Sequence, residues 1–241
     1  MRIALIGRGR VATHLLKALL QAGHEVVSVN SRTLEELPLE ADVYILSVKD
    51  SALQDVIRNA VKGREGQLFV HTAGSMSMDL FKGCCARYGV LYPMQTFSKN
   101  RPVDFRTIPC FIEASDASTL ELVQNIASRI SNKVVPADSE KRRKLHLAAV
   151  FACNLANHCY RLAERVLEEE HIDFNLYLPL IQETARKVTV MSPREAQTGP
   201  MVRYDLGVMA AQKSLLKDER TRKIYQLMAE SIHEDSLLCV K

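Results

Sequence analysis

The chain has 241 residues, of which 47 % are hydrophobic and 25 % charged, and its formal net charge is +4 at pH 7. This composition is typical of a soluble globular protein with one large domain or two modest ones. The mild charge, with acids interspersed among bases, argues against the basic stripe of a nucleic-acid binder. No apolar run reaches the roughly 18 residues of a membrane span. We therefore expect neither a nucleic acid nor a membrane as partner.

Cysteine usage and the N-terminus bear on the location of the protein. The six cysteines show no CxxC spacing, so reduced thiols in the cytoplasm are expected. Met1 leads directly into the first predicted strand, which leaves no room for a leader peptide. The sequence contains no HExxH, paired CxxC or GxSxG pattern, so no metal site and no hydrolytic site is expected.

The first half of the chain alternates short apolar runs with amphipathic stretches. This alternation predicts βαβ units and a Rossmann-type, doubly wound, mostly parallel sheet. The strands are expected over residues 2–6, 25–29, 43–48, 67–71, 90–92, 109–113 and 133–135. The helices are expected over residues 11–21, 53–61, 78–86 and 118–131.

From Ser139 onward the sequence shows only helical periodicity. We therefore expect an α/β domain over residues 1–138, followed by an all-helical domain over 139–241. The helices are predicted over residues 139–171 (with Ser139 as N-cap), 173–191, 205–216 and 218–238, with a break at 192–200. The basic run at 141–144 is interpreted as a solvated first turn or as an anion contact. Residues 145–155 are apolar nearly all round, which predicts a buried core helix.

A glycine-rich turn, Gly-Arg-Gly-Arg-Val-Ala at residues 7–12, connects the first predicted strand to the first predicted helix. It matches GxGxxA, in which Gly7 permits the tight turn and Gly9 lets the backbone approach a pyrophosphate. The N–H groups of Arg10 and Val11, together with the helix dipole, favour phosphate. The turn therefore predicts a dinucleotide site, and a merely structural tight turn is the alternative.

The choice of dinucleotide depends on the end of the second predicted strand, about 20 residues later. An NAD site usually places Asp or Glu there, whereas this sequence has Asn30, Ser31 and Arg32. A carboxylate would repel a 2′-phosphate, while Ser31 and Arg32 can donate hydrogen bonds to it. NADP(H) is therefore favoured over NAD(H), unless Arg32 is only a solvated loop cation.

The ends of three later strands supply further candidates, because the carboxyl ends of parallel strands meet at one edge of the sheet. The cofactor-lining candidates are Ser47, Val48, Thr72, Ala73 and Gly74. Ser75 is a candidate for catalysis, through a hydrogen bond to the substrate or the nicotinamide, and Gln95 and Thr96 are candidates for substrate binding. Ordinary turns and strand-end loops are the alternatives.

Four stretches resemble a known family: FVHTAGS (69–75), YPMQTFS (92–98), KLHLAAVFACN (144–154) and TGPMVRYD (198–205). They are similar to the family that joins a Rossmann-like domain to a C-terminal domain of unknown function numbered 2520. The turn, the NSRT stretch and the order of the domains also resemble the 6-phosphogluconate dehydrogenase-like superfamily, which includes pyrroline-carboxylate reductases and hydroxyacid dehydrogenases. The resemblance implies the fold and an NAD(P) cofactor, but no particular substrate.

Polar residues on the first predicted helix of the second domain are candidates for catalysis. His146 is the candidate general acid, because imidazole can donate a proton near neutral pH; a hydrogen-bonded core histidine is the alternative. Asn154 is the second candidate. In the superfamily's hydroxyacid dehydrogenases this helix contributes Lys and, one turn later, Asn. Here Val150 stands one turn before Asn154, so the pair is not reproduced.

Arg203 and Asp205 follow a Gly-Pro break in the second domain. Arg203 is a candidate for binding an anionic group of the substrate, and Asp205 for shaping the pocket. Alternatively, Asp205 caps the next helix and Arg203 pairs with it. The resemblance implies interlocked helical domains, so a homodimer through the C-terminal helices is expected.

The sequence therefore predicts an NADP(H)-dependent oxidoreductase that acts on a small carbonyl or imine compound between its two domains. The alternative is a non-catalytic dinucleotide-binding sensor or scaffold, which the missing Lys–Asn pair favours.

Overall fold

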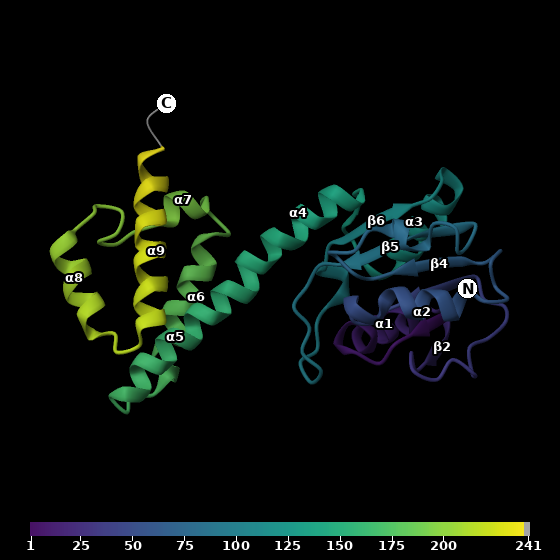
Figure 1. Ribbon diagram of the computed structural model, residues 1–241, viewed down its shortest axis with the longest axis horizontal. Coiled ribbons are helices and arrows are strands. Elements are labelled where there is room, and N and C mark those ends of the chain that lie inside the picture. The colour runs from purple at the N-terminus through teal and green to yellow at the C-terminus, as the bar shows by residue number, and fades with distance from the viewer. Residues whose placement is uncertain (239–241) are drawn as a thin grey trace. The chain divides into compact units, whose positions relative to one another are not determined.

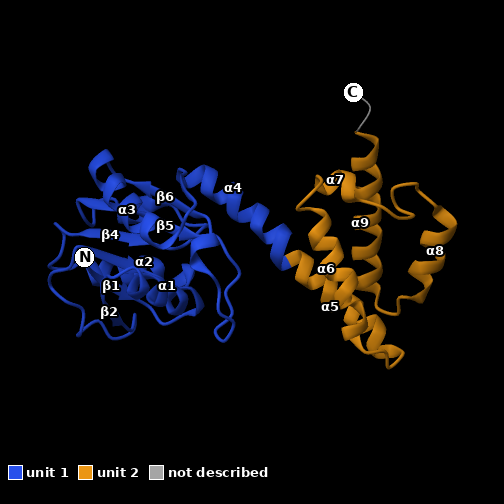
Figure 2. Ribbon diagram, turned by 180° about the vertical axis from the view of Figure 1, so that it is seen from behind, with its two compact units in different colours: residues 1–154 blue, residues 155–241 orange. Residues whose placement is uncertain are grey.

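The computed structural model describes residues 1–238. It divides into two compact units, Met1–Asn154 and Leu155–Lys241, drawn in blue and orange in Figure 2. Unit 1 contains a seven-stranded sheet, and the described part of unit 2 is helical (Figure 1). The predicted fold class, an α/β sheet followed by helices, is confirmed.

All seven predicted strands form one sheet, in the order β2-β1-β3-β4-β5-β6-β7. Their bounds are β1 Arg2–Ile6, β2 Glu25–Val29, β3 Val43–Leu46, β4 Leu68–His71, β5 Arg87–Pro93, β6 Cys110–Ala114 and β7 Val134–Pro136. The pairs from β2 to β5 are parallel, and β6 runs antiparallel to β5. The carboxyl ends of β1 to β5 therefore share one edge.

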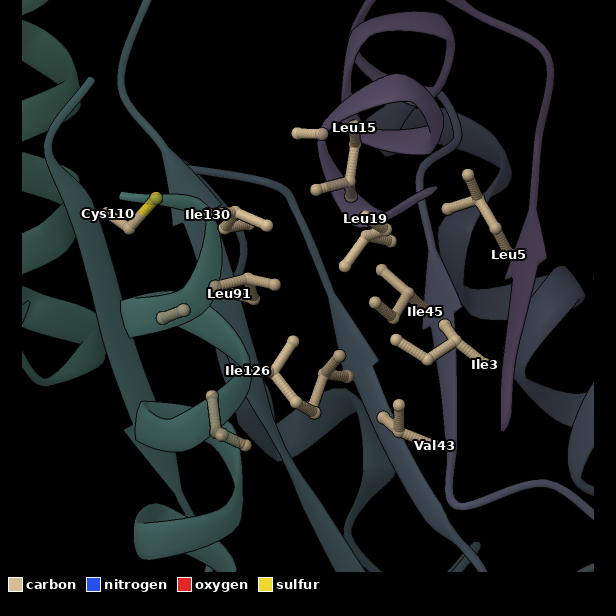
Figure 3. Packing of buried hydrophobic residues seen from close by; sticks show 14 of the residues in the cluster. Ile3, Leu5, Leu15, Leu19, Val43, Ile45, Leu91, Cys110, Ile126 and Ile130 are labelled. Carbon is tan, nitrogen blue, oxygen red and sulfur yellow. The ribbon is translucent and has the colours of Figure 1, made fainter. Parts of the chain in front are cut away.

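Helices cover both faces of the sheet, which explains why its strands are apolar nearly throughout. Side chains alternate along β1: Ile3 and Leu5 lie on the face that α1 (Arg10–Gln21) covers over this strand, and that α3 (Ala117–Ile130) covers over β5 and β6 (Figure 3). Ala4 and Ile6 point to the other face, which α2 (Asp50–Val61) and η1 (Met78–Phe81) cover over the neighbouring strands.

The helix predicted over residues 78–86 is wrong. The segment forms only the four-residue 3-10 helix η1, which Ser77 caps by accepting a hydrogen bond from the N–H of Asp79. Phe81 is fully buried against the sheet. Gly83 then adopts a φ of 77°, a left-handed conformation that ends the helix and returns the chain to β5.

A long helical stretch links the two units. It consists of α4 (Ser139–Ala149), the π-helical segment η3 (Val150–Leu155) and α5 (Ala156–Glu169), so the predicted helix over 139–171 is essentially confirmed. Its N-cap is not Ser139 but Asp138, whose Oδ1 accepts a hydrogen bond from the N–H of Lys141 at 2.7 Å. The side chain of Ser139 bonds instead to Glu113 on β6.

Residues 145–155 are not the buried helix that the sequence predicts. Leu147, Phe151 and Leu155 are 57 %, 63 % and 45 % exposed. Within one chain, the described residues provide no covering layer for this stripe. The stretch is therefore apolar, as its sequence indicates, but a single copy of the chain does not bury it.

Unit 2 continues with η4 (Phe174–Tyr177), α6 (Leu178–Lys187), α7 (Pro193–Ala196), α8 (Leu206–Leu215) and α9 (Glu219–Leu237). The helix predicted over 173–191 ends earlier, at Lys187, and the predicted break contains the short, box-capped α7. None of the helices between residues 1 and 238 combines the length and apolarity needed to cross a bilayer.

Candidate functional site

Gly7 lies at the point where the order of the sheet reverses, because β1 is flanked by β2 on one side and β3 on the other. Its φ is 126°, and its N–H donates to the carbonyl of Val29 at 2.9 Å. A Cβ at this position would lie 2.2 Å from the carbonyl oxygen of Ser47. Only glycine fits this turn, which lies where ligands of open α/β sheets bind.

The first turn of α1 is open to an anion. Gly9 is the N-cap and provides no side-chain cap, and the first turn holds no acidic residue. A Cβ at Gly9 would meet nothing within 4 Å, so a ligand can approach the backbone there. The first N–H groups of a helix have no intrahelical acceptors. Arg10 and Val11 therefore offer donors at the positive end of the helix dipole.

The end of β2 presents donors and no carboxylate. The Oδ1 of Asn30 accepts a hydrogen bond from the N–H of Arg32 at 3.1 Å, which holds the turn after the strand. Ser31 is half-buried, and Arg32 is exposed. This arrangement suits a phosphate better than a ribose hydroxyl that needs an acceptor.

The ends of β3 and β4 are tied together by side chains. The hydroxyl of Thr72 donates to Ser47 Oγ at 3.1 Å, and both residues are buried. Ser75 donates to the carboxylate of Asp50 in the first turn of α2, so this predicted site residue is held by the protein. Val48 and Ala73 are half-buried, and the loop after β4 lies against the edge where Gly7 turns.

His71, the last residue of β4, holds that loop through two contacts of its ring. The ring is fully buried; its Nδ1 accepts from the N–H of Ala73 at 3.2 Å, and its Nε2 lies 3.4 Å from the carbonyl of Ser77. Burial, assisted by the positive charge of Arg142, lowers the pKa of His71 to about 3. The ring is therefore neutral and serves both contacts at once.

The structure brings His146 and Tyr92 together beside Gly74. The phenol oxygen of Tyr92, near the end of β5, lies 3.0 Å from Nδ1 of His146 on α4. A Cβ at Gly74 would lie 2.7 Å from that nitrogen and 2.7 Å from Cζ of Tyr92. The absence of a side chain at Gly74 is thus what allows the contact.

A buried ion pair fixes the start of α4. Arg142 is fully buried and pairs with Glu113 on β6, whose side chain is 11 % exposed. Arg142 also donates to the carbonyl of Met76 and to Ser139 Oγ, while the N–H and hydroxyl of Ser139 each donate to Glu113 at 2.8 Å. The interpretation of residues 141–144 as a solvated turn is therefore wrong for Arg142.

The other predicted residues have surroundings of their own. Gln95 and Thr96 are exposed, and the Oε1 of Gln95 accepts from the N–H of Thr96 at 2.8 Å. Asn154 is exposed in the π-helical segment. In unit 2, Asp205 caps α8 by accepting from the N–H of Val208 at 3.1 Å, as the alternative predicted, and Arg203 is exposed.

Sequence reasoning missed Tyr92, Arg142 and Glu113. Tyr92 lies in an apolar strand, so the sequence indicates an ordinary core residue. Arg142 is one of four consecutive basic residues, and nothing in that run distinguishes it from the other three. A signal was nevertheless present, because Arg142 and His146 are four residues apart and so share a helix face.

Comparisons with known proteins identify the family of the chain. The family model "Domain of unknown function (DUF2520)" matches residues 108–232. The chain belongs to the DUF2520 family. The resemblance seen in the sequence is thereby confirmed. A second model, "NADP oxidoreductase coenzyme F420-dependent", matches residues 2–39, and these two matches place the chain among the Rossmann-type oxidoreductases.

Solved structures extend the comparison. BF3122 from Bacteroides fragilis, a "putative NADP oxidoreductase", is 45 % identical, with 97 % of this chain and 98 % of that chain covered and a TM-score of 0.91. Protein TM1727 from Thermotoga maritima is 22 % identical, with coverages of 97 % and 98 % and a TM-score of 0.73. An imine reductase from Myxococcus stipitatus, in complex with NADP+, shares the fold at 16 % identity, coverages of 100 % and 94 %, and a TM-score of 0.63. Comparison with curated proteins gives no match.

The buried ion pair predicts a large loss of stability in Arg142→Met. Removing the arginine leaves the Glu113 carboxylate without its partner in a buried position, which costs about 3–5 kcal/mol. The free energy of unfolding from urea titration measures the effect. The matched control is Arg143→Met at the exposed neighbouring position, and equal stabilities of the two variants would contradict the assignment.

The close approach at Gly74 predicts that Gly74→Ala separates Tyr92 from His146. The added methyl overfills the contact, with an expected loss of about 1–3 kcal/mol. Gly66→Ala is the control, since a Cβ there meets nothing within 4 Å. Urea titration and a crystal structure of the variant check both statements; an unchanged distance between the two side chains would refute the second.

Proposed function

We propose that this oxidoreductase is NADP(H)-dependent and transfers hydride between the nicotinamide and a small carbonyl or imine compound. The observation that carries the proposal is the open, uncapped start of α1 beyond Gly7, at the reversal point of the sheet. Membership in the DUF2520 family supports it. The imine reductase from M. stipitatus and a pyrroline carboxylate reductase from Plasmodium falciparum share the fold, which supports the substrate class.

The residues fit the cofactor in three segments. The N–H groups at Arg10 and Val11 would bind the pyrophosphate, with Gly7 and Gly9 giving it room. Asn30, Ser31 and Arg32 would hold the ribose phosphate. The edge formed by Ser47, Val48, Thr72, Ala73 and Gly74 would line the cofactor toward its nicotinamide end. When bound, the nicotinamide supplies or accepts the hydride.

His146 is the proposed proton donor of the reaction. It is half-buried beside the loop that follows β4, and its ring is held by Tyr92. Ser75 and Asn154 are the further candidates for catalysis, and Gln95, Thr96, Arg203 and Asp205 are the candidates for substrate binding. Arg203 is the exposed cation among them, suited to an anionic substrate group.

Cofactor choice is tested by titrating the protein with NADPH and NADH in parallel, followed by cofactor fluorescence. Wild type is expected to prefer NADPH. Arg32→Gln is expected to weaken NADPH binding by about tenfold to a hundredfold, the loss of one charge-assisted contact, and to leave NADH binding nearly unchanged.

The matched control is Arg129→Gln. Arg129 lies in the last turn of α3, and its charge acts on His24, which directly precedes β2. It is therefore near the amino end of β2, whereas Arg32 follows the carboxyl end of that strand. Equal affinity of wild type for the two cofactors would refute the preference for NADP(H). Binding without turnover on a panel of oxo acids, aldehydes and cyclic imines would instead favour a dinucleotide sensor or scaffold.

We also propose that the helices of unit 2 pair with those of a second copy. Among its described residues, only Leu167 and Ala229 are buried apolar residues. Leu180 on α6 and Leu227 on α9 are 60 % and 66 % exposed. An apolar groove of about 240 Å³ runs along α5 and α9. So much exposed apolar surface is rare in a monomer and typical of an obligate interface.

Sedimentation velocity tests this assembly. Wild type is expected to sediment as a dimer, and Leu227→Glu to shift the equilibrium toward monomer, because it would bury a charge in the interface. Leu39→Glu is the control, since Leu39 is 70 % exposed in unit 1. A monomeric wild type at micromolar concentration would overturn the proposal.

A further inference from the structure

We infer that Tyr92 is a positioning residue for the reaction: its O–H donates to Nδ1 of His146, places the proton of the neutral ring on Nε2, and so makes Nε2–H the donor to the substrate. The inference deepens the proposed function and rests on it. It assigns a role to Tyr92, which the sequence did not suggest.

The contact between the two side chains is well defined. Tyr92 is 8 % exposed, and its oxygen lies 3.0 Å from Nδ1. The rings meet edge to face, with centroids 5.9 Å apart and an interplanar angle of 66°. A buried phenol must place its hydrogen on an acceptor, and among the described residues Nδ1 is the acceptor within reach.

Protonation of the phenol follows from its surroundings. Burial raises the pKa of Tyr92, and the positive charge of Arg142 offsets this only in part. Tyr92 therefore remains a neutral phenol near neutral pH and can act as a donor. A neutral imidazole has one donor and one acceptor nitrogen, so a donor at Nδ1 requires the ring proton on Nε2.

The protein holds this geometry from two sides. Gly74 lets both side chains approach its Cα. Arg142 lies one turn before His146 on the same face of α4 and is anchored to Glu113 and Met76, which fixes the start of the helix. The imidazole therefore meets Tyr92 as part of a rigid frame, and a rigid frame is what orientation of a proton donor needs.

The other ring nitrogen is available to a ligand. Nε2 of His146 has no hydrogen bond to the described part of the chain, and it is not among the buried nitrogens that lack a partner. Tyr92 contacts Nδ1, the other nitrogen of the ring. A neutral imidazole N–H held in this way can polarise a carbonyl, as it does in other enzymes.

In the reducing direction NADPH would supply the hydride, which would add to the carbon of the substrate's C=O or C=N bond. Nε2 gives its proton to the oxygen or nitrogen of that bond, and the Tyr92 O–H gives its proton to Nδ1. Burial disfavours the resulting phenolate, and the positive charge of Arg142 offsets only part of that cost, so the phenolate is short-lived. A proton from the bulk solvent then adds to Nε2, and Nδ1 returns its proton to Tyr92, so each hydride consumes one proton from solvent.

Nitrogen NMR of histidine-labelled protein tests the tautomer without any turnover. Two-bond 15N–1H correlations at alkaline pH distinguish Nδ1–H from Nε2–H, and the His146 signals are assigned by their loss in His146→Gln. Wild type is expected to show the Nε2–H pattern, and Tyr92→Phe a mixture of both. Tyr88→Phe is the control, since Tyr88 lies on the same strand and outside this contact. A ring proton on Nδ1 in wild type, or an unchanged pattern in Tyr92→Phe, would overturn the inference.

Steady-state kinetics tests the consequence for the reaction. Tyr92→Phe keeps the ring, so it is expected to bind NADPH like wild type and to lose about a hundredfold in kcat, within the range that general acid catalysis contributes. Tyr88→Phe should keep the wild-type kcat. An unchanged kcat in Tyr92→Phe would remove Tyr92 from the mechanism. If wild type binds no NADPH and reduces no substrate, the proposed function fails, and the NMR result still decides the tautomer separately.

Discussion

A buried arginine is the interaction on which the candidate site depends. Arg142 has no contact with solvent, so its charge is tolerated only because Glu113, Ser139 and the carbonyl of Met76 meet it. These partners come from β6, from α4 itself and from the loop after β4. The ion pair therefore joins three segments that are far apart in the sequence. One turn further along α4, the same frame places His146 against Tyr92.

Two glycines divide the carboxyl edge of the sheet into two parts with different chemistry. At Gly7 the chain turns against Ser47, and the start of α1 is left open to an anion. At Gly74 the chain passes close to the Tyr92–His146 pair. In our proposal the part at Gly7 binds the phosphate groups of the cofactor, and the part at Gly74 donates a proton to the substrate. Both depend on close approach of backbone, which any larger residue would prevent.

The apolar stretch at residues 145–155 shows where hydrophobic periodicity misleads. The sequence predicted a buried helix over 145–155, yet Leu147 and Phe151 are exposed in the single chain. A hydrophobic pattern indicates that a surface must be covered, because exposing apolar area to water is unfavourable in free energy. The pattern does not indicate whether residues of the same chain or of a second copy cover that surface. The proposed dimer follows from that difference.

The sequence by itself determined the sheet, its seven strands, the glycine turn and the acid-free end of β2. These features are local, because apolar alternation and glycine spacing depend on neighbours along the chain. It also singled out His146, as one polar residue in an apolar run. Only the tertiary structure decided what His146 contacts, that Arg142 is buried, and that 78–86 turns back after one short helix. Each of these depends on which distant segments come into contact, and spacing along the sequence does not specify those contacts.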